Sequence, residues 1–226
     1  MTPSSGSPWD DHGLAKAIND YWRKSDFEQE HRAAVARIIQ RLGSATVLDV
    51  GCGTGLLYAF IAEKNEYCGI DSSTEMLSIA RKQHGHAQFV RGDARHLPFR
   101  EKSFELITCV DMLQHIDNIQ PVLSALSEIS AEHVLVVTWT HGLPTQRRSV
   151  NLSSKEGKLT ETIVSAGRFQ YIVYNLNELL EIILKANGVS RHQLAIYDLG
   201  ANSIAIQIKV SALEEREHQD TGQSLI

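Results

Sequence analysis

The chain has 226 residues, 42% of them hydrophobic, and a formal net charge of −5. This length and composition predict one globular domain that buries its own core, and no apolar run approaches the roughly 18 residues of a membrane-spanning helix. The net negative charge disfavours a nucleic acid partner, because proteins that bind nucleic acid phosphates normally carry a positively charged surface.

Positive charge outside the N-terminal helix is concentrated in Arg147, Arg148, Lys155 and Lys158. A solvated loop face is the favoured interpretation of these four side chains, and a site for a phosphate or an acidic substrate is the alternative. The first eight residues lack a basic flank followed by an apolar stretch, so we expect a cytoplasmic protein.

The three cysteines are expected to be reduced and buried. They have no C-x-x-C spacing, and the ten histidines form no cluster, so no zinc site is predicted.

The first 45 residues predict an N-terminal helical cap. A helix over 27–42 carries apolar or small residues at near-helical spacing and stops at Gly43. The segment before it places four aromatic residues among charged ones, and we expect it to help select a substrate: Trp9, Tyr21, Trp22 and Phe27.

A buried strand over 46–50 runs directly into a glycine-rich loop. Gly51, Gly53 and Gly55 predict a turn tight enough for backbone to touch a ligand, and an amphipathic helix follows over 55–64. A dinucleotide fingerprint would need glycine at position 56, where Leu56 stands. Leu56 therefore weakens the alternative of a nucleotide-dependent oxidoreductase.

The second strand, over 66–71, ends in an acid. Asp71 lies twenty residues beyond Gly51, where a carboxylate would accept hydrogen bonds from both hydroxyls of a ribose. Ser72 and Glu75 predict a capping box that starts a helix over 73–84, with Met76 on its inner face.

Two further strands complete this half of the chain. A strand over 87–91 leads into a loop that contains Asp93 and Ala94, and an apolar strand over 104–109 breaks at 110–111 into a turn and a helix. Ligands of open parallel sheets bind beyond the carboxyl ends of the strands, so residues 109–115 should border both cofactor and substrate.

Taken in order, these segments resemble the motifs of class I S-adenosylmethionine-dependent methyltransferases, over about residues 46–139. The resemblance implies that the glycine-rich loop holds the methionine end of the cofactor, that Asp71 holds its ribose, and that Asp93 and the amide of Ala94 hold its adenine. The implied cofactor site comprises Asp49, Gly51, Cys52, Gly53, Gly55, Asp71, Ser72, Met76, Asp93, Ala94, Cys109 and Val110.

The remaining sequence predicts a helix over 119–130, a strand over 133–139, a helix over 175–187 and strands over 191–198 and 203–210. The fold class is α/β, a doubly wound, mostly parallel sheet of seven strands with helices on both faces and the last strand antiparallel. A lid insertion is expected over about 141–174, in which the β-prone runs 160–164 and 169–174 form a hairpin. The polar tail 211–226 is expected to be disordered.

Methyl transfer can be driven mainly by proximity and orientation, and a general base is needed only for a hydroxyl or a protonated amine. Asp111 and His115 would share a helix face if a helix begins by Asp111, and His141 and Tyr171 are further candidates. For each of them the alternative is a helix cap or a solvated polar residue.

The sequence therefore predicts a methyltransferase that uses S-adenosylmethionine, gives S-adenosylhomocysteine and methylates a small molecule at oxygen, nitrogen or carbon. Methylation of tRNA or protein, and a non-catalytic partner that only binds the cofactor, remain as alternatives. Both monomer and homodimer are compatible with the residues.

Overall fold

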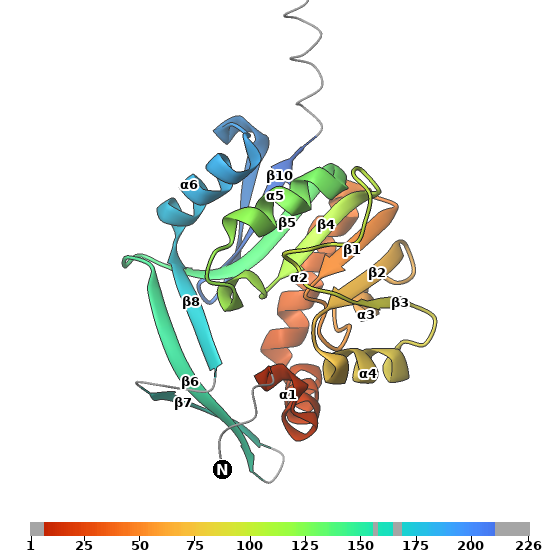
Figure 1. Cartoon of the computed structure of the whole chain (residues 1–226), viewed down its shortest axis with the longest axis vertical. Coiled ribbons are helices and arrows are strands. Elements are labelled where there is room, and N and C mark those ends of the chain that lie inside the picture. Colours follow the sequence, from red (N-terminus) through yellow and green to blue (C-terminus); the bar gives the residue numbers. More distant parts are fainter. Residues whose placement is uncertain (1–6, 156–157, 165–168, 211–226) are drawn as a thin grey trace, which may run out of the picture.

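A computed structural model describes residues 7–155, 158–164 and 169–210 (Figure 1). The expected polar tail over 211–226 and the expected turn over 165–168 lie outside these residues.

Seven strands form the central sheet in the order β3-β2-β1-β4-β5-β10-β9. Strands β1 to β5 are parallel, whereas β10 runs antiparallel to both β5 and β9. This topology confirms the expected mostly parallel sheet with an antiparallel last strand. The strands are β1 (Thr46–Val50), β2 (Glu66–Asp71), β3 (Gln88–Arg91), β4 (Phe104–Val110), β5 (Ser130–His141), β9 (Leu194–Gly200) and β10 (Ser203–Lys209).

Helices cover both faces of this sheet. Helices α5 (Gln120–Ile129) and α6 (Leu176–Asn187) lie on the face turned toward the viewer in Figure 1, and α2 (Asp26–Leu42) lies behind it. Helix α2 begins at the Ser25 cap, whose hydroxyl accepts from the Glu28 amide, and ends at Gly43 with φ 72°. The remaining helical segments are α1 (His12–Lys24), α3 (Tyr58–Ile61) and α4 (Thr74–Gln83), with 3-10 turns at η1 (Pro8–Asp10), η2 (Leu113–His115) and η3 (Arg191–Gln193).

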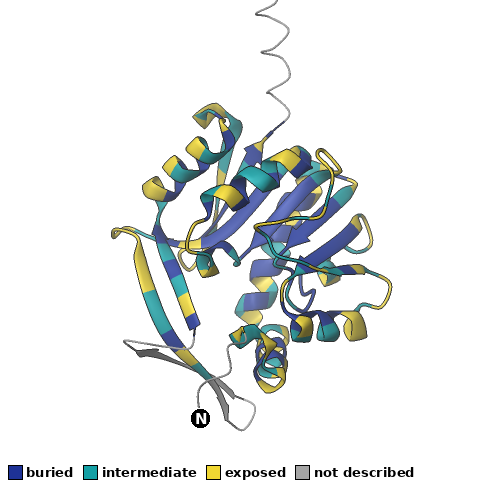
Figure 2. Ribbon diagram, in the orientation of Figure 1, coloured by how far each residue is buried: buried dark blue, intermediate teal, exposed yellow. Residues whose placement is uncertain are grey.

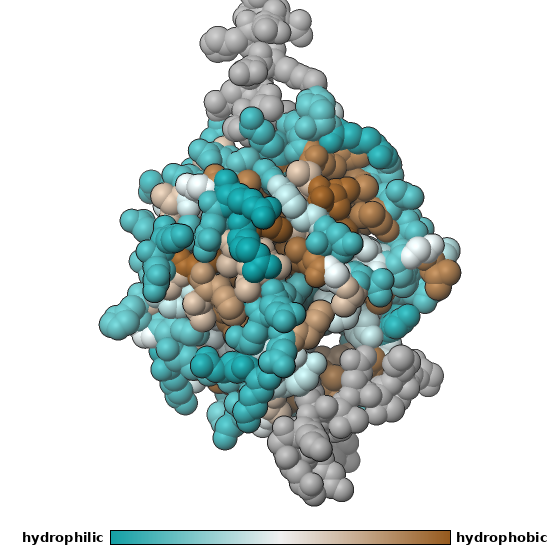
Figure 3. Space-filling view, turned by 180° about the vertical axis from the view of Figure 1, so that it is seen from behind, coloured by the Kyte–Doolittle hydropathy of each residue, from teal (hydrophilic) through white to brown (hydrophobic). Residues whose placement is uncertain are grey.

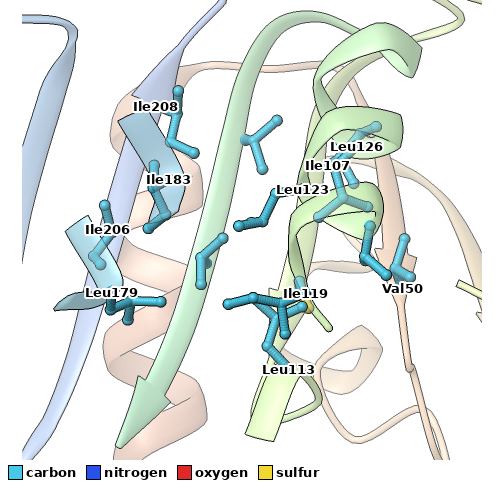
Figure 4. Close-up of a cluster of buried hydrophobic side chains, with 14 of the residues drawn as sticks. Val50, Ile107, Leu113, Ile119, Leu123, Leu126, Leu179, Ile183, Ile206 and Ile208 are labelled. Atoms are coloured by element: carbon cyan, nitrogen blue, oxygen red, sulfur yellow. The ribbon is translucent and has the colours of Figure 1, made fainter. Parts of the chain in front are cut away.

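The core is made of aliphatic side chains between the sheet and its helices. Figure 2 shows the central strands of the sheet as mostly buried, whereas the edge strands β3 and β9 are more exposed. Figure 4 shows one cluster, in which Leu123 and Leu126 of α5 and Ile183 of α6 face Ile107 and Ile206 of the sheet. Full burial of each such side chain contributes roughly 1.5–3 kcal/mol, which makes the sheet a rigid support for the loops at its edge.

The helix expected over 55–64 is mostly absent. Only Tyr58–Ile61 are α-helical, because Gly51, Gly53 and Gly55 all have positive φ and the chain continues in turns up to Leu57. The glycine spacing that identifies the loop therefore also delays the helix.

The expected hairpin between 160–164 and 169–174 is wrong in its pairing. Strands β7 (Lys158–Val164) and β8 (Phe169–Asn175) both pair antiparallel with β6 (Gln146–Lys155), which lies between them. Strand β8 joins this lid to the end of β5 through Thr140 and His141. In Figure 1 the lid descends from the sheet toward α1, beyond the carboxyl ends of the parallel strands.

The reverse side of the molecule is largely hydrophilic (Figure 3), with apolar patches between the polar residues. Among the described residues, the exposed large hydrophobic side chains are Tyr21, Trp139, Leu143 and Ile196. No helix in the described ranges is both long and apolar enough to cross a membrane.

Candidate functional site

A cavity of about 710 Å³ lies beyond the carboxyl ends of the parallel strands. Its walls come from the loops after β1, β2, β3 and β4, from η1 and α2, and from lid strands β6 and β8. This position is the one at which open α/β sheets bind ligands, and the volume lies within the range of cofactor and small-molecule sites.

The glycine-rich loop is fixed to the neighbouring strand β2. The Gly51 amide donates to the Ile70 carbonyl at 2.8 Å, and the Gly53 amide donates to Asp71 Oδ2 at 2.9 Å. A Cβ atom on Gly51 would lie 2.3 Å from the Met112 side chain, and Gly51 has φ 76°. Any other residue at position 51 would therefore be strained and would collide with the loop after β4.

Gly55 has a different role from Gly51 and Gly53. A Cβ atom there would lie 2.9 Å from Phe89 and 3.1 Å from His84, and Gly55 is not among the residues that line the cavity. Gly55 therefore lets the loop pack onto the domain, and the structure does not place it against a ligand.

Asp71 lies at the end of β2 and lines the cavity. Its two carboxylate oxygens accept from the amides of Gly53 and Ser73, and burial raises its pKa while these amides oppose the rise. Each oxygen keeps a second lone pair, so the carboxylate can still accept from ligand hydroxyls.

The capping residue of α4 is Ser73 and not Ser72. Ser73 accepts from the Met76 amide, and its own hydroxyl donates to the Trp9 carbonyl at 2.8 Å. Ser72 is exposed and lines the cavity together with Met76. The N-cap is thus one residue later than expected and the capping box is not formed, because Met76 occupies the third helical position and Glu75 instead contacts His12.

Asp93 and Ala94 line the cavity beyond β3. Asp93 pairs with Arg95 through both carboxylate oxygens, and the Arg95 guanidinium lowers the pKa of Asp93. The carboxylate is therefore ionised at neutral pH and acts only as an acceptor.

Asp49 is buried at the base of the cavity. It accepts from the Tyr67 hydroxyl at 2.8 Å and from the Thr108 hydroxyl at 2.9 Å. Burial is the largest influence and raises its pKa to about 6, against the opposing effect of these two hydrogen bonds and of Arg32. Asp49 therefore gains or loses its proton at a pH close to the physiological range.

Cys52 and Val110 also line the cavity, whereas Cys109 does not. Cys109 is completely buried within β4, and burial raises the pKa of its thiol. Its side chain belongs to the sheet core, because alternate residues of a strand point to opposite faces. All three cysteines are free thiols.

Asp111 is held by a buried ionic network and not by a helix. It has φ 53°, and the following η2 is a single 3-10 turn, so the expected helix face shared by Asp111 and His115 is wrong. Asp111 Oδ2 accepts from Arg32 at 2.8 Å and Oδ1 accepts from the Trp139 indole at 3.0 Å. Glu28 Oε2 lies 3.8 Å from Arg32 on the same helix.

His31 extends this network to β10. Its Nδ1 lies 2.6 Å from Arg32, and its Nε2 lies 2.8 Å from the Ser203 hydroxyl. Burial lowers the pKa of His31. Because Arg32 can only donate, the neutral ring accepts at Nδ1 and donates from Nε2 to Ser203.

His115 lines the cavity opposite the glycine-rich loop. Its Nδ1 lies 3.3 Å from the Gln170 carbonyl of β8, and its ring packs edge-on against Trp9 with centroids 5.1 Å apart. Desolvation is the largest influence and lowers its pKa, against the opposing effects of the Gln170 carbonyl and Asp111, so the ring is neutral near pH 7 and able to accept a proton.

The other two base candidates lie in different surroundings. Tyr171 of β8 lines the cavity, whereas His141 lies outside it at the end of β5. Both ring nitrogens of His141 are buried without a hydrogen-bond partner. The described residues contain no group of three or more His, Cys, Asp or Glu side chains that could hold a metal ion.

Several cavity residues were not expected from the sequence. Arg32 was assigned only to a helix, although an arginine on the apolar side of an amphipathic helix indicates a buried partner. Met112 and Gln114 lie within the segment 109–115 that was expected to border cofactor and substrate, and Phe169 reaches the cavity from the lid.

Comparison with known proteins gives one family. Residues 47–132 match the model of a methyltransferase domain. A demethylmenaquinone methyltransferase of Thermotoga maritima is 39% identical over 98 residues, which cover 42% of this chain and 39% of that protein. A ubiquinone biosynthesis O-methyltransferase of Photorhabdus laumondii is 31% identical over 150 residues, which cover 57% of this chain and 60% of that protein.

Solved structures show the same fold at low sequence identity. CalS10, described as an amino pentose methyltransferase from Micromonospora echinaspora, matches with a TM-score of 0.61 and 16% identity over 86% of this chain and 96% of that one. DesVI of Streptomyces venezuelae matches with a TM-score of 0.61 and 14% identity over 88% and 98% of the two chains.

The chain spans 39% and 60% of the length of the two curated relatives described above. The family match covers the strands and loops that build the glycine-rich loop, Asp71 and Asp93. Residues 47–132 are therefore similar in sequence to a methyltransferase domain, and the chain has the fold of the solved methyltransferase structure CalS10.

Proposed function

We propose that the protein is an enzyme that transfers the methyl group of S-adenosylmethionine to a small-molecule acceptor. The observation that carries this proposal is one continuous cavity wall, which runs from the glycine-rich loop past Asp71 to Asp93 and ends at the loop after β4. The two ends of that wall suit the two reactants, cofactor along the loops and acceptor beneath the lid.

The residues present fit the cofactor. Asp71 would hold the ribose hydroxyls, Asp93 and the Ala94 amide would hold the adenine, and the turn from Gly51 to Gly53 leaves backbone exposed for the methionine end. Arg32 also lies on the wall, where its charge is already paired with Asp111 and Glu28.

The bound cofactor supplies an electrophilic methyl group, so this chain's contribution is mainly to align an acceptor with it and to exclude water. The lid and η1 perform the second task, since Trp9 and Phe169 pack edge-on with centroids 5.0 Å apart over the cavity. For an acceptor that must lose a proton, we assign the base to His115, which faces the cavity and is neutral. Asp111 is already committed to Arg32 and Trp139.

A small acceptor is supported by the cavity of about 710 Å³ and by the relatives, two of which are named for menaquinone and ubiquinone methylation. The net charge of −5 supports an acceptor other than nucleic acid. Three free thiols support a cytoplasmic location. Either a monomer or a homodimer would leave the cavity within one chain.

The test is release of S-adenosylhomocysteine by the purified protein, incubated with S-adenosylmethionine and a panel of small phenols, catechols, amines and enols. We expect at least one acceptor class to raise the release above the acceptor-free rate, and the Asp71→Ala variant to abolish the rise. If the protein binds the cofactor but no acceptor in the panel raises the rate of S-adenosylhomocysteine release, the result would point to a binding protein without transferase activity.

A further inference from the structure

The far end of the cavity combines an aromatic wall with one cation. Trp9 packs edge-on against both His115 and Phe169, at centroid distances of 5.1 Å and 5.0 Å, and Tyr171 lines the same end. Aromatic rings in such edge-to-face arrangements favour another flat ring between or beside them. This wall suits a planar acceptor.

Arg147 is the cation at this end. It projects from β6 onto the cavity and donates to Asp117 Oδ1 at 2.7 Å and to Gln170 Oε1 at 3.0 Å. Its side chain is 47% exposed and that of Asp117 is 76% exposed. Ion pairs this open to water contribute little to stability and exchange readily with other anions.

The other arginines on the cavity wall are committed elsewhere. Arg32 is buried against Glu28 and Asp111, and Arg95 is bound by both oxygens of its near neighbour Asp93. Of the arginines that line the cavity, Arg147 has the partner that solvent and ligand can most easily replace.

Asp117 shows which kind of chemical group Arg147 can bind. The Arg147 guanidinium is already paired with a carboxylate, and the planar shape of a guanidinium matches that of a carboxylate closely. Asp117 therefore stands in for an anionic group of the acceptor, which would displace it on binding.

Gln170 links His115 to Arg147. Its carbonyl lies 3.3 Å from Nδ1 of His115, while its side-chain oxygen accepts from Arg147. The proposed base and the cation thus contact the same residue, so one aromatic ring can present a hydroxyl to one and a carboxylate to the other.

We propose that Arg147 is a specificity-determining residue, and that the acceptor is a small aromatic ring carrying both a carboxylate and the hydroxyl to be methylated. This inference rests on the proposed function. It assigns a binding role to one of the four cations, for which a solvated loop face was the favoured interpretation.

Binding of 4-hydroxybenzoate and of its uncharged isostere 4-hydroxybenzamide to the whole protein, with and without S-adenosylhomocysteine, tests the proposal by calorimetry. We expect the acid to bind at least about tenfold more tightly than the amide, and Arg147→Met to remove this preference. Arg148→Met is the matched control, since Arg148 is adjacent and does not line the cavity, and it should retain the preference.

The Asp117→Asn variant should change the affinity for the acid in the opposite direction. Without its competing carboxylate, the variant should bind the acid several-fold more tightly and the amide unchanged. Arg147 and Asp117 are exposed, so circular dichroism melts should show all variants folded.

The proposal is overturned if the acid and amide bind equally to the parent protein, if neither binds, or if the preference survives in Arg147→Met. An unchanged acid affinity in Asp117→Asn would also contradict it. Titration of the same samples with S-adenosylhomocysteine reports separately on the cofactor site, so loss of that binding would count against the proposed function alone.

Discussion

Arg32 on α2 donates a 2.8 Å hydrogen bond to Asp111, the residue at which β4 leaves the sheet. The pair joins the N-terminal helix to the loop that carries Met112 and His115, both of which line the cavity. Because Glu28 also lies 3.8 Å from Arg32, one buried cation is shared by two carboxylates. The N-terminal region is therefore part of the site.

Replacing Arg32 by Met should destabilise the fold by about 3 kcal/mol, because it leaves two partly buried carboxylates without a cation. Adding Asp111→Asn to that variant should recover part of the loss, and asparagine tolerates the positive φ at position 111. Urea unfolding measures both values. Arg37→Met on the exposed face of the same helix should change stability by less than about 0.5 kcal/mol; an equal loss there would show that the helix and not the ion pair is responsible.

Asp49→Asn should stabilise the protein at pH 8. The folded pKa of Asp49 is raised to about 6, so the native state holds its proton more tightly than the unfolded chain does. Burying the charged form thus costs up to about 3 kcal/mol above pH 6, and this cost disappears as the pH falls from 6 through 4. The difference in unfolding free energy between variant and parent should therefore be largest above pH 6 and should disappear as the pH falls toward 4. A gain that is independent of pH would contradict the raised pKa.

Asp71→Ala should weaken the affinity for S-adenosylhomocysteine by on the order of 2 kcal/mol, or about thirtyfold, through loss of charge-assisted hydrogen bonds. Glu75→Ala is the matched control, because Glu75 is a nearby carboxylate in the first turn of α4 and does not line the cavity. Calorimetric titration measures both. Unchanged affinity in Asp71→Ala would remove Asp71 from the cofactor site.

His115→Ala should lower the turnover of a phenolic acceptor by roughly 10²-fold or more and leave the affinity for S-adenosylhomocysteine nearly unchanged. In the parent enzyme, kcat should rise with pH while His115 loses its proton and then level off, with an apparent pKa below the ordinary 6.5 because desolvation lowers it. The variant should lack this step. A pH step that persists without His115 would transfer the role of base to another group.

Much of the fold was predictable because its signals are local. The glycine spacing after β1, the acid at the end of β2 and the Gly43 stop of α2 each depend on a few neighbouring residues. The order of the parallel strands follows from the same alternation of strands and helices.

The errors arose where the structure depends on distant partners. Whether β7 pairs with β8 or with β6 is decided by register across the lid, which periodicity does not contain. Asp111 leaves β4 in a left-handed conformation because Arg32 and Trp139 hold its carboxylate, and both partners lie far away in the sequence. Cys109 and Gly55 are expected in the site from their position in a motif, whereas the structure buries the Cys109 side chain and packs the backbone of Gly55 against Phe89.

Isothermal titration of the purified protein with S-adenosylmethionine, S-adenosylhomocysteine and NAD in separate runs tests the central claim most directly. The account predicts binding of both adenosyl ligands and none of NAD, since Leu56 stands where a dinucleotide loop needs glycine. Absence of binding by both adenosyl ligands, or binding of NAD in their place, would contradict it.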